Sequence, residues 1–165
     1  MRRLTFLCSA VISALISSTA FAQVSEPSYR GYTTERVLSL GGICFAKSRN
    51  DGAAFMDLCE KVMLQMTSER EFNDVGEENV PNVDRFVRSA IYAEMAVVSR
   101  TVRKSPSGPY RASSCALFGS AIEELDAISG SVRAMGLSPT DLDKIRGDYL
   151  EQMSSCPERY LPVRR

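Results

Sequence analysis

The chain has 165 residues, and its 20 lysines and arginines are balanced by 20 aspartates and glutamates. This balance argues against nucleic-acid binding, which depends on a clear excess of basic residues. The chain also contains no histidine. That absence excludes nucleophile systems built on a histidine base and removes the commonest protein ligand of zinc and haem.

The first 22 residues are expected to be a cleaved signal peptide. Two arginines precede an apolar run at residues 4–16, and Ala20-Phe21-Ala22 supplies the small-x-small pattern of a cleavage site. A membrane anchor would need roughly 20 apolar residues, and this run is shorter. We therefore expect export to the periplasm and a mature chain with no membrane span.

Residues 23–33 are polar and contain proline and glycine, which is typical of a flexible lead-in. Helical spacing begins at about residue 34, where Val37, Leu40 and Cys44 recur at steps of three and four. This spacing predicts a helix over 34–48. Two consecutive glycines weaken it, since a mid-helix glycine costs about 1 kcal/mol relative to alanine.

The segment "RNDG" at residues 49–52 predicts a turn, and helical spacing resumes after it over 52–69. Residues 69–83 are acidic and contain a glycine and a proline, so they are expected to form the one long loop. Apolar residues then recur every three or four positions, which predicts a third helix over 83–104.

Charged residues are unevenly distributed around this loop. Six acids and one base lie from Glu69 to Asp84, whereas six bases and one acid lie from Arg85 to Arg111. One interpretation is a pair of opposed patches that steer a charged partner; the other is ordinary solvation of a loop and a helix. The residues predicted to contact a partner are the acids of the loop and an aromatic–arginine pair in "SGPYR": Glu71, Asp74, Glu77, Glu78, Tyr110 and Arg111.

Two more helices are predicted after the proline-rich "SPSGPYR". The fourth covers 112–135 and ends at a glycine, which tolerates the positive φ favoured there. The fifth begins with Ser138 as N-cap and Pro139 in the first helical position. Residues 157–165 are expected to be an extended tail. The prediction is an all-α bundle of about five helices within 34–156.

Four cysteines remain after signal cleavage: Cys44, Cys59, Cys115 and Cys156. An even number in an exported chain favours disulfides over a metal site. Facing residues of an antiparallel helical hairpin have a nearly constant index sum, because one helix rises as its partner descends. The midpoints of Cys44 with Cys59 and of Cys115 with Cys156 both fall on predicted turns. These two pairs are therefore preferred among the three possible connectivities.

No motif in the chain indicates catalysis. Glu123, Glu124 and Asp126 are the nearest approach to a carboxylate cluster, but adjacent acids on the outer face of a helix are expected to contact only solvent. Methionines on the apolar stripes are expected to fill the core rather than to bind copper(I). These are Met56, Met63, Met66, Met95, Met135 and Met153. We expect no cofactor.

The leading interpretation is a small exported helical protein that binds another envelope or secreted protein. In its general plan the predicted protein resembles periplasmic inhibitor and immunity proteins, because it combines an export signal, two disulfides and a helical bundle without a catalytic motif. Envelope or secretion accessories are a further subclass. The alternative is a helical module that encloses an apolar small molecule. The chain is not expected to be an enzyme, and an enzyme that uses carboxylates alone is the third class considered.

Overall fold

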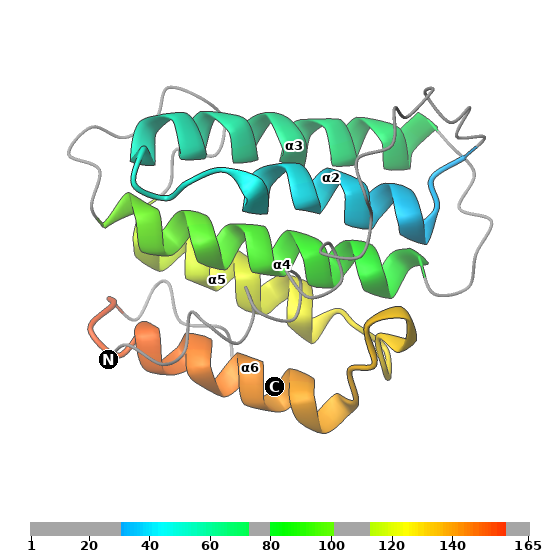
Figure 1. Cartoon of the computed structure of the whole chain (residues 1–165). Helices are drawn as coiled ribbons and strands as arrows, with labels where there is room; N and C mark the ends of the chain where they lie inside the picture. Colours follow the sequence, from blue (N-terminus) through cyan, green and yellow to red (C-terminus); the bar gives the residue numbers. More distant parts are fainter. Residues whose placement is uncertain (1–30, 73–79, 101–112, 158–165) are drawn as a thin grey trace.

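The computed structural model describes residues 31–72, 80–100 and 113–157. These ranges contain five α-helices, one short 3₁₀ helix and no β-strand, which confirms the all-α prediction (Figure 1). The segment predicted to be a signal peptide (1–22), the part of the predicted lead-in before residue 31 and the predicted tail after Pro157 lie outside the described residues. The elements are α2 (Thr34–Ala46), α3 (Gly52–Phe72), α4 (Val80–Ser99), α5 (Ser114–Asp126), η1 (Arg133–Met135) and α6 (Pro139–Gln152).

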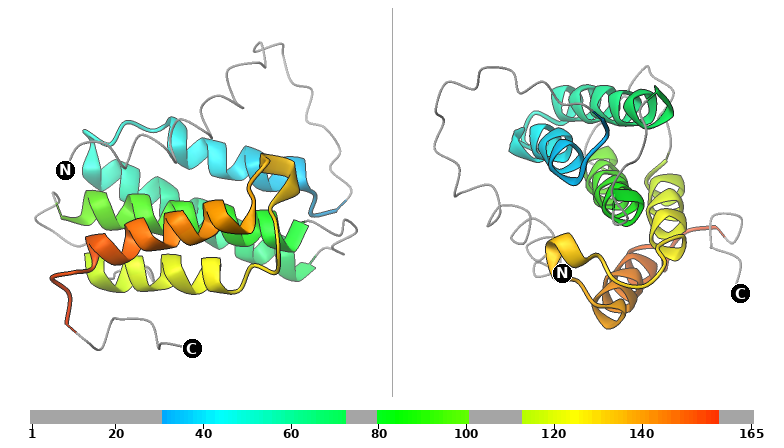
Figure 2. Two further views of the ribbon diagram at one scale, coloured as in Figure 1. Left: turned by 90° about the horizontal axis from the view of Figure 1, so that it is seen from below. Right: turned by 90° about the vertical axis from the view of Figure 1, so that its right-hand side faces the viewer.

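Helix α4 is the centre of the bundle. Helices α2 and α3 pack against it as an antiparallel hairpin, and α5 packs against another side. Helix α6 packs on α5, and the end-on view shows α4 enclosed by its neighbours (Figure 2). Most of the 20 residues of α4 are buried, so this helix has almost no solvent-facing side.

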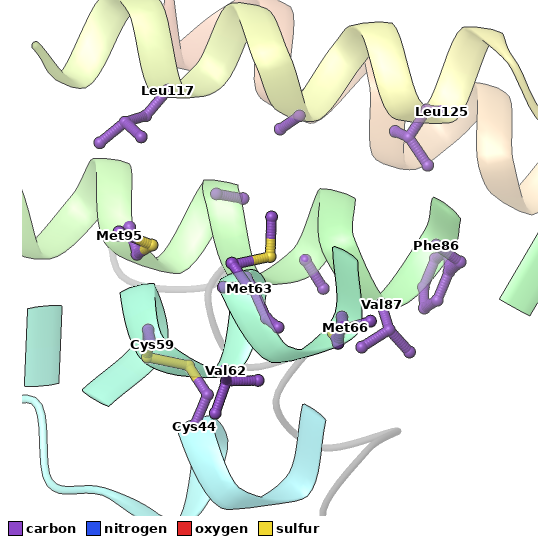
Figure 3. Close-up of a cluster of buried hydrophobic side chains, with 14 of the residues drawn as sticks. Cys44, Cys59, Val62, Met63, Met66, Phe86, Val87, Met95, Leu117 and Leu125 are labelled. Carbon is purple, nitrogen blue, oxygen red and sulfur yellow. A yellow bond between two sulfur atoms is a disulfide. The ribbon is translucent and has the colours of Figure 1, made fainter. Parts of the chain in front are cut away.

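The hydrophobic core lies on both sides of α4 (Figure 3). Met63 and Met66 of α3 are fully buried on one side, and Leu117 and Leu125 of α5 are buried on the other. Unbranched methionine fits irregular gaps between helices. The prediction that the methionines fill the core is confirmed, since all six are buried: Met56, Met63, Met66, Met95, Met135 and Met153.

The end of the expected flexible lead-in is packed rather than free. Tyr32 is 1% exposed, and its hydroxyl donates a hydrogen bond of 2.5 Å to Asp84 Oδ1. The next residue, Thr33, is the N-cap of α2, because its hydroxyl accepts from the Arg36 amide at 3.2 Å. The packed domain therefore starts before residue 34.

The first three helices differ at their ends from the predicted ranges 34–48, 52–69 and 83–104. The largest differences are in α4, which begins earlier and ends earlier than expected. Its second residue is Pro81. Proline fits the first turn of a helix, because amide groups there have no intrahelical acceptor. The proline taken as a loop signal therefore belongs to the helix.

The prediction of one continuous helix over 112–135 is wrong. Helix α5 ends at Asp126, and the chain after it forms a loop with an antiparallel bridge between Val132 and Leu137. Within this loop Gly130 has a φ of +83°, a conformation that interrupts a right-handed helix and that glycine adopts without steric cost.

A contact from α4 holds this loop in place. The side-chain nitrogen of Asn82 donates to the Ser129 backbone carbonyl at 2.8 Å, and the side-chain oxygen of Asn82 accepts from the Ser129 backbone amide at 3.3 Å. The loop thus has hydrogen bonds to another helix in addition to those within it, such as the one from the Val132 amide to the Leu137 carbonyl at 3.0 Å. Apolar spacing alone does not reveal such a partner, because Asn82 is 47 residues away in the chain.

The start of α6 agrees with the prediction. The Ser138 hydroxyl accepts from the Asp141 amide, and the Asp141 side chain accepts from the Ser138 amide, which together form a capping box. Pro139 is the first residue of the helix. Gly136 has a φ of +66°, so it adopts the predicted left-handed conformation, although it ends η1 rather than a long α-helix.

Both preferred disulfides are present. Cys44–Cys59 joins α2 to α3 with a Cα–Cα distance of 4.8 Å, and Cys115–Cys156 joins the start of α5 to the chain after α6 with 5.7 Å. Each spans a pair of antiparallel neighbours, as predicted, although the midpoint of Cys115 and Cys156 falls within the connection 127–138 and not at a tight turn between two long helices. Both lie toward the end of the bundle where α2 is followed by α3 (Figure 1). We call this end the disulfide end.

Candidate functional site

The residues predicted to contact a partner are only partly within the described chain. Glu71 is exposed on the last turn of α3. Asp74, Glu77 and Glu78 follow it in 73–79 and, like Tyr110 and Arg111, lie outside the described residues. Since α3 extends beyond its predicted end, Glu71 stands on a helix and not in the loop that was expected to carry it.

Opposite the disulfide end, three groups of charged residues join the helices. We call this the ion-pair end. In the first group, the Arg36 guanidinium of α2 donates to both carboxylate oxygens of Glu69 on α3, at 2.8 and 2.5 Å. Gln65 adds a third donor at 2.8 Å. The hydrogen bonds from Arg36 hold the pKa of Glu69 below its usual value.

The second group contains the most deeply buried acid of this end. The side chain of Asp84 on α4 is 2% exposed, accepts from the Tyr32 hydroxyl and pairs with Arg70 of α3 at 3.3 Å. Burial and the adjacent negative charge of Asp84 raise the pKa of Tyr32 far above its usual value. Tyr32 therefore remains a neutral donor that satisfies Asp84.

The third group joins three helices around Arg88 of α4. Its guanidinium donates to Glu124 of α5 at 3.2 Å and to the Thr67 hydroxyl of α3 at 3.0 Å. Arg85 pairs with the other oxygen of Glu124 at 3.4 Å. Burial alone would lower the pKa of Arg88, but the carboxylates of Asp84 and Glu124 outweigh burial and raise it.

These pairs correct two expectations about surface charge. Glu124 and Asp126 do not contact only solvent: Glu124 pairs with α4, and Asp126 accepts two hydrogen bonds from Arg146 of α6 at 2.6 and 3.2 Å. Arg85 and Arg88 likewise serve as ties between helices and not as a free basic patch. Of the predicted partner residues, Glu71 is the one that the structure describes, and it is exposed.

Two buried carboxylates lie outside the ion-pair end. Glu94 of α4 is 5% exposed, and its Oε1 accepts from Arg49 at 2.8 Å. Among the described residues its Oε2 has no hydrogen-bond partner, and the same is true of Oε1 of Glu60, which is 7% exposed. Burial raises the pKa of Glu94, although the positive charge of Arg49 opposes this.

Sequence reasoning missed both of these acids, although the chain contained a signal for them. Glu60 lies four residues after Met56 and three before Met63, so it falls on the apolar stripe of α3. Glu94 likewise lies three residues after Ile91. Polar residues on an apolar stripe are the ones expected to be buried.

A small pocket lies between the end of α5 and the first half of α6. It has a volume of about 210 Å³, whereas small-molecule sites typically have about 300–1,000 Å³. Leu125 and Leu142 contribute apolar walls, and the charged side chains of Asp126, Asp143 and Arg146 also line it. Because Asp126 and Arg146 are paired with each other, the pocket offers little unsatisfied charge to a ligand.

The described surface leaves two large apolar side chains exposed. These are Ile43 on α2 and Leu64 on α3, with 46% and 47% exposure. Both belong to the hairpin that Cys44–Cys59 joins and that carries Glu71. The α2–α3 hairpin thus combines exposed apolar side chains, an exposed acid and a covalent cross-link.

The described residues contain no group of three or more His, Cys, Asp or Glu side chains placed to hold a metal ion. The helices in the same part of the chain include none with the length and apolar character needed to cross a bilayer. Comparison of the chain with protein-family models, with curated proteins and with solved structures finds no match.

Proposed function

We propose that this protein is an exported periplasmic scaffold that binds another envelope or secreted protein, as an inhibitor, an immunity protein or a secretion accessory. Two intramolecular disulfides are typical of proteins from oxidising compartments, and the first 22 residues have the pattern of an export signal. The disulfides restrict the unfolded chain and stabilise the helical hairpins by about 3 and about 4 kcal/mol.

The observation that carries this proposal is the exposure of Ile43 and Leu64 on the same cross-linked hairpin. Apolar side chains fixed on helices contribute to binding with little loss of conformational freedom. Burying a fully exposed Leu or Ile side chain stabilises by about 1.5–3 kcal/mol. Covering the exposed half of each side chain would therefore contribute about 1 kcal/mol per residue.

Charge indicates what kind of partner fits this hairpin. Glu71 is exposed at the end of α3, and the sequence continues with Asp74, Glu77 and Glu78. A cluster of acids accelerates encounter with a basic surface and makes the rate depend on salt. The partner we propose has an apolar contact surface bordered by lysine or arginine residues.

The proposal is tested by cross-linking the protein in the intact envelope and then measuring its binding to the captured partner. Ile43→Glu combined with Leu64→Glu should raise the Kd at least tenfold, mainly through faster dissociation. Glu71→Lys should slow association and reduce its dependence on salt. Glu151→Lys, on the exposed side of α6, is the matched charge control and should change neither quantity.

Two results would contradict the proposal. An unchanged Kd for the Ile43→Glu, Leu64→Glu protein, with its helical circular dichroism intact, would show that this hairpin is not the binding surface. Purified protein that carries a stoichiometric apolar molecule in native mass spectrometry would instead favour the alternative of a small-molecule carrier.

A further inference from the structure

The cysteines of the two disulfides differ in how exposed they are. Cys44 and Cys59 are both 0% exposed, whereas Cys115 and Cys156 are only partly buried. Thiol–disulfide exchange needs a thiolate to reach one sulfur atom of the bond. These exposures favour attack at Cys115–Cys156 over attack at Cys44–Cys59 in the folded protein.

The helices joined by the two disulfides also differ in how they are held. Helices α2 and α3 each pack on α4 as well as on each other. Helix α6 packs mainly on α5, at the edge of the bundle (Figure 2). Loss of Cys44–Cys59 therefore leaves both of its helices anchored by α4, whereas α6 has no comparable second support among the described helices.

Among the described residues, α6 is held by two buried side chains and by contacts that are mostly exposed, including two hydrogen bonds from Arg100 to Gln152 at 3.0 and 2.9 Å. Its buried residues are Leu142 and Tyr149, and Tyr149 lies against the Phe118 ring with 5.9 Å between centroids. The Arg146–Asp126 pair has side chains that are 31% and 36% exposed. Exposed ion pairs contribute only about 0–1 kcal/mol, so they hold α6 weakly.

We propose that Cys115–Cys156 is a redox-sensitive latch whose reduction in the folded protein releases α6 from α5, while Cys44–Cys59 stays oxidised. The reductant is a dithiol, of the class found in exported thiol–disulfide oxidoreductases. One of its thiolates attacks Cys115 or Cys156 and forms a mixed disulfide, which breaks the bond between the two cysteines. Its second thiolate then displaces the protein sulfur, so the protein gains two electrons and two protons and the dithiol becomes a disulfide.

Reduction of Cys115–Cys156 removes the covalent link that holds the end of α6 to the start of α5. The chain already joins α5 to α6 through residues 127–138 at the ion-pair end, and Cys115–Cys156 closes the hairpin at the other end. Without the bond, α6 can open about that loop as a local unit. Opening exposes the apolar side chains at the contact between α5 and α6, including Phe118 of α5 and Tyr149 of α6.

The first test measures which cysteines become reduced in the native protein. The folded protein is treated with dithiothreitol, quenched at intervals with an alkylating reagent and mapped by mass spectrometry. Alkylation of Cys115 and Cys156 should appear at least tenfold faster than alkylation of Cys44 and Cys59. The same treatment in denaturant, where all sulfur atoms are accessible, should remove most of this difference. Similar rates for both disulfides in the native protein would overturn the proposal.

The second test measures release of α6. Hydrogen–deuterium exchange is compared between the oxidised protein and protein selectively reduced and alkylated at Cys115 and Cys156. Amides of residues 140–152 should exchange at least tenfold faster after reduction, while those of α3 should be unchanged. The Cys115→Ser, Cys156→Ser protein should behave in the same way and serves as a check on the effect of alkylation. Unchanged exchange in α6, or equal acceleration in α3, would show that the bond is not a latch.

Discussion

Gly41 shows how one residue can weaken a helix and yet be required by its packing. A Cβ atom added at Gly41 would lie 2.6 Å from Val87 Cγ1 on α4, which is closer than van der Waals contact allows. Val87 is 1% exposed and β-branched, so it cannot rotate away without disturbing the core. The glycine that costs helix propensity in α2 therefore permits the close approach of α2 to the central helix.

We expect Gly41→Ala to destabilise the protein by about 1–3 kcal/mol, as overpacking of a core does. Gly147 is the matched control, because it also lies in a helix and a Cβ there would meet nothing within 4 Å. Gly147→Ala should stabilise by up to about 1 kcal/mol through helix propensity. Urea unfolding of both variants measures these changes, and a stabilising Gly41→Ala would refute the packing argument.

At the scale of elements, α4 joins the bundle through charges as well as apolar contacts. Arg88 is buried in α4 and contacts Thr67 of α3 and Glu124 of α5. Removing one member of a buried ion pair leaves the other without compensation and typically costs about 3–5 kcal/mol. An exposed pair contributes far less, because water already solvates both charges. A carboxylate–guanidinium pair therefore contributes more to the stability of the fold on α4, where it is buried, than on α6, where it is exposed.

Arg88→Ala should therefore destabilise by about 3 kcal/mol, whereas Arg146→Ala, which breaks the exposed pair with Asp126, should cost less than about 1 kcal/mol. The double variant Arg88→Met, Glu124→Leu should recover most of the loss, since it leaves no buried charge unpaired. Thermal and urea unfolding provide the comparison. Equal losses for the two single arginine variants would mean that Arg88 does not tie the helices together.

For the whole molecule, the two ends of the bundle are held by different chemistry. Two disulfides and the Arg49–Glu94 pair join the helices at the disulfide end, whereas carboxylate–guanidinium pairs without a disulfide join them at the ion-pair end of the described chain. The carboxylates at the two ends also respond differently to acid. Hydrogen bonds from Arg36 lower the pKa of Glu69, whereas burial raises the pKa of Glu94.

Because the two pKa values shift in opposite directions, Glu69 and Glu94 change the stability of the fold in opposite directions as the pH falls. The stabilisation from Glu69 is complete above its unfolded pKa of about 4.5 and is lost as the pH falls through its lower folded value. Glu94 contributes increasing stability as the pH falls through its raised folded pKa toward the same 4.5. We expect amides near Glu69 to lose protection as the pH falls below 4.5, and amides near Glu94 to gain protection as the pH falls toward 4.5.

Hydrogen exchange at these pH values, corrected for intrinsic rates, measures both effects. Glu94→Gln should abolish the gain in amide protection, because the glutamine side chain does not titrate although its oxygen still accepts from Arg49. Arg36→Met should remove the loss of amide protection that the protonation of Glu69 causes on acidification. If both ends lose protection together on acidification from pH 7, the assignment of separate electrostatic behaviour to them is wrong.

The sequence predicted the helices and the cross-links better than the charged contacts. Cys44–Cys59 and Cys115–Cys156 follow from apolar spacing and from the two turns, all of which are local features of the chain. The end of α5 was placed too late, since the contact of Asn82 with Ser129 joins residues far apart in sequence. Glu124 was expected to contact only solvent, because nothing near it in the chain indicates that Arg85 and Arg88 pack beside it.

The amino-acid sequence by itself determined that this protein is a bundle of helices and favoured one of the three possible cysteine pairings, because helical periodicity and hairpin register are properties of neighbouring residues. Only the tertiary structure decided that α4 is central, that its charges are paired and that α6 stands at the edge. Burial, ion pairing and access to a disulfide depend on which surfaces meet in space, and those surfaces come from distant parts of the chain.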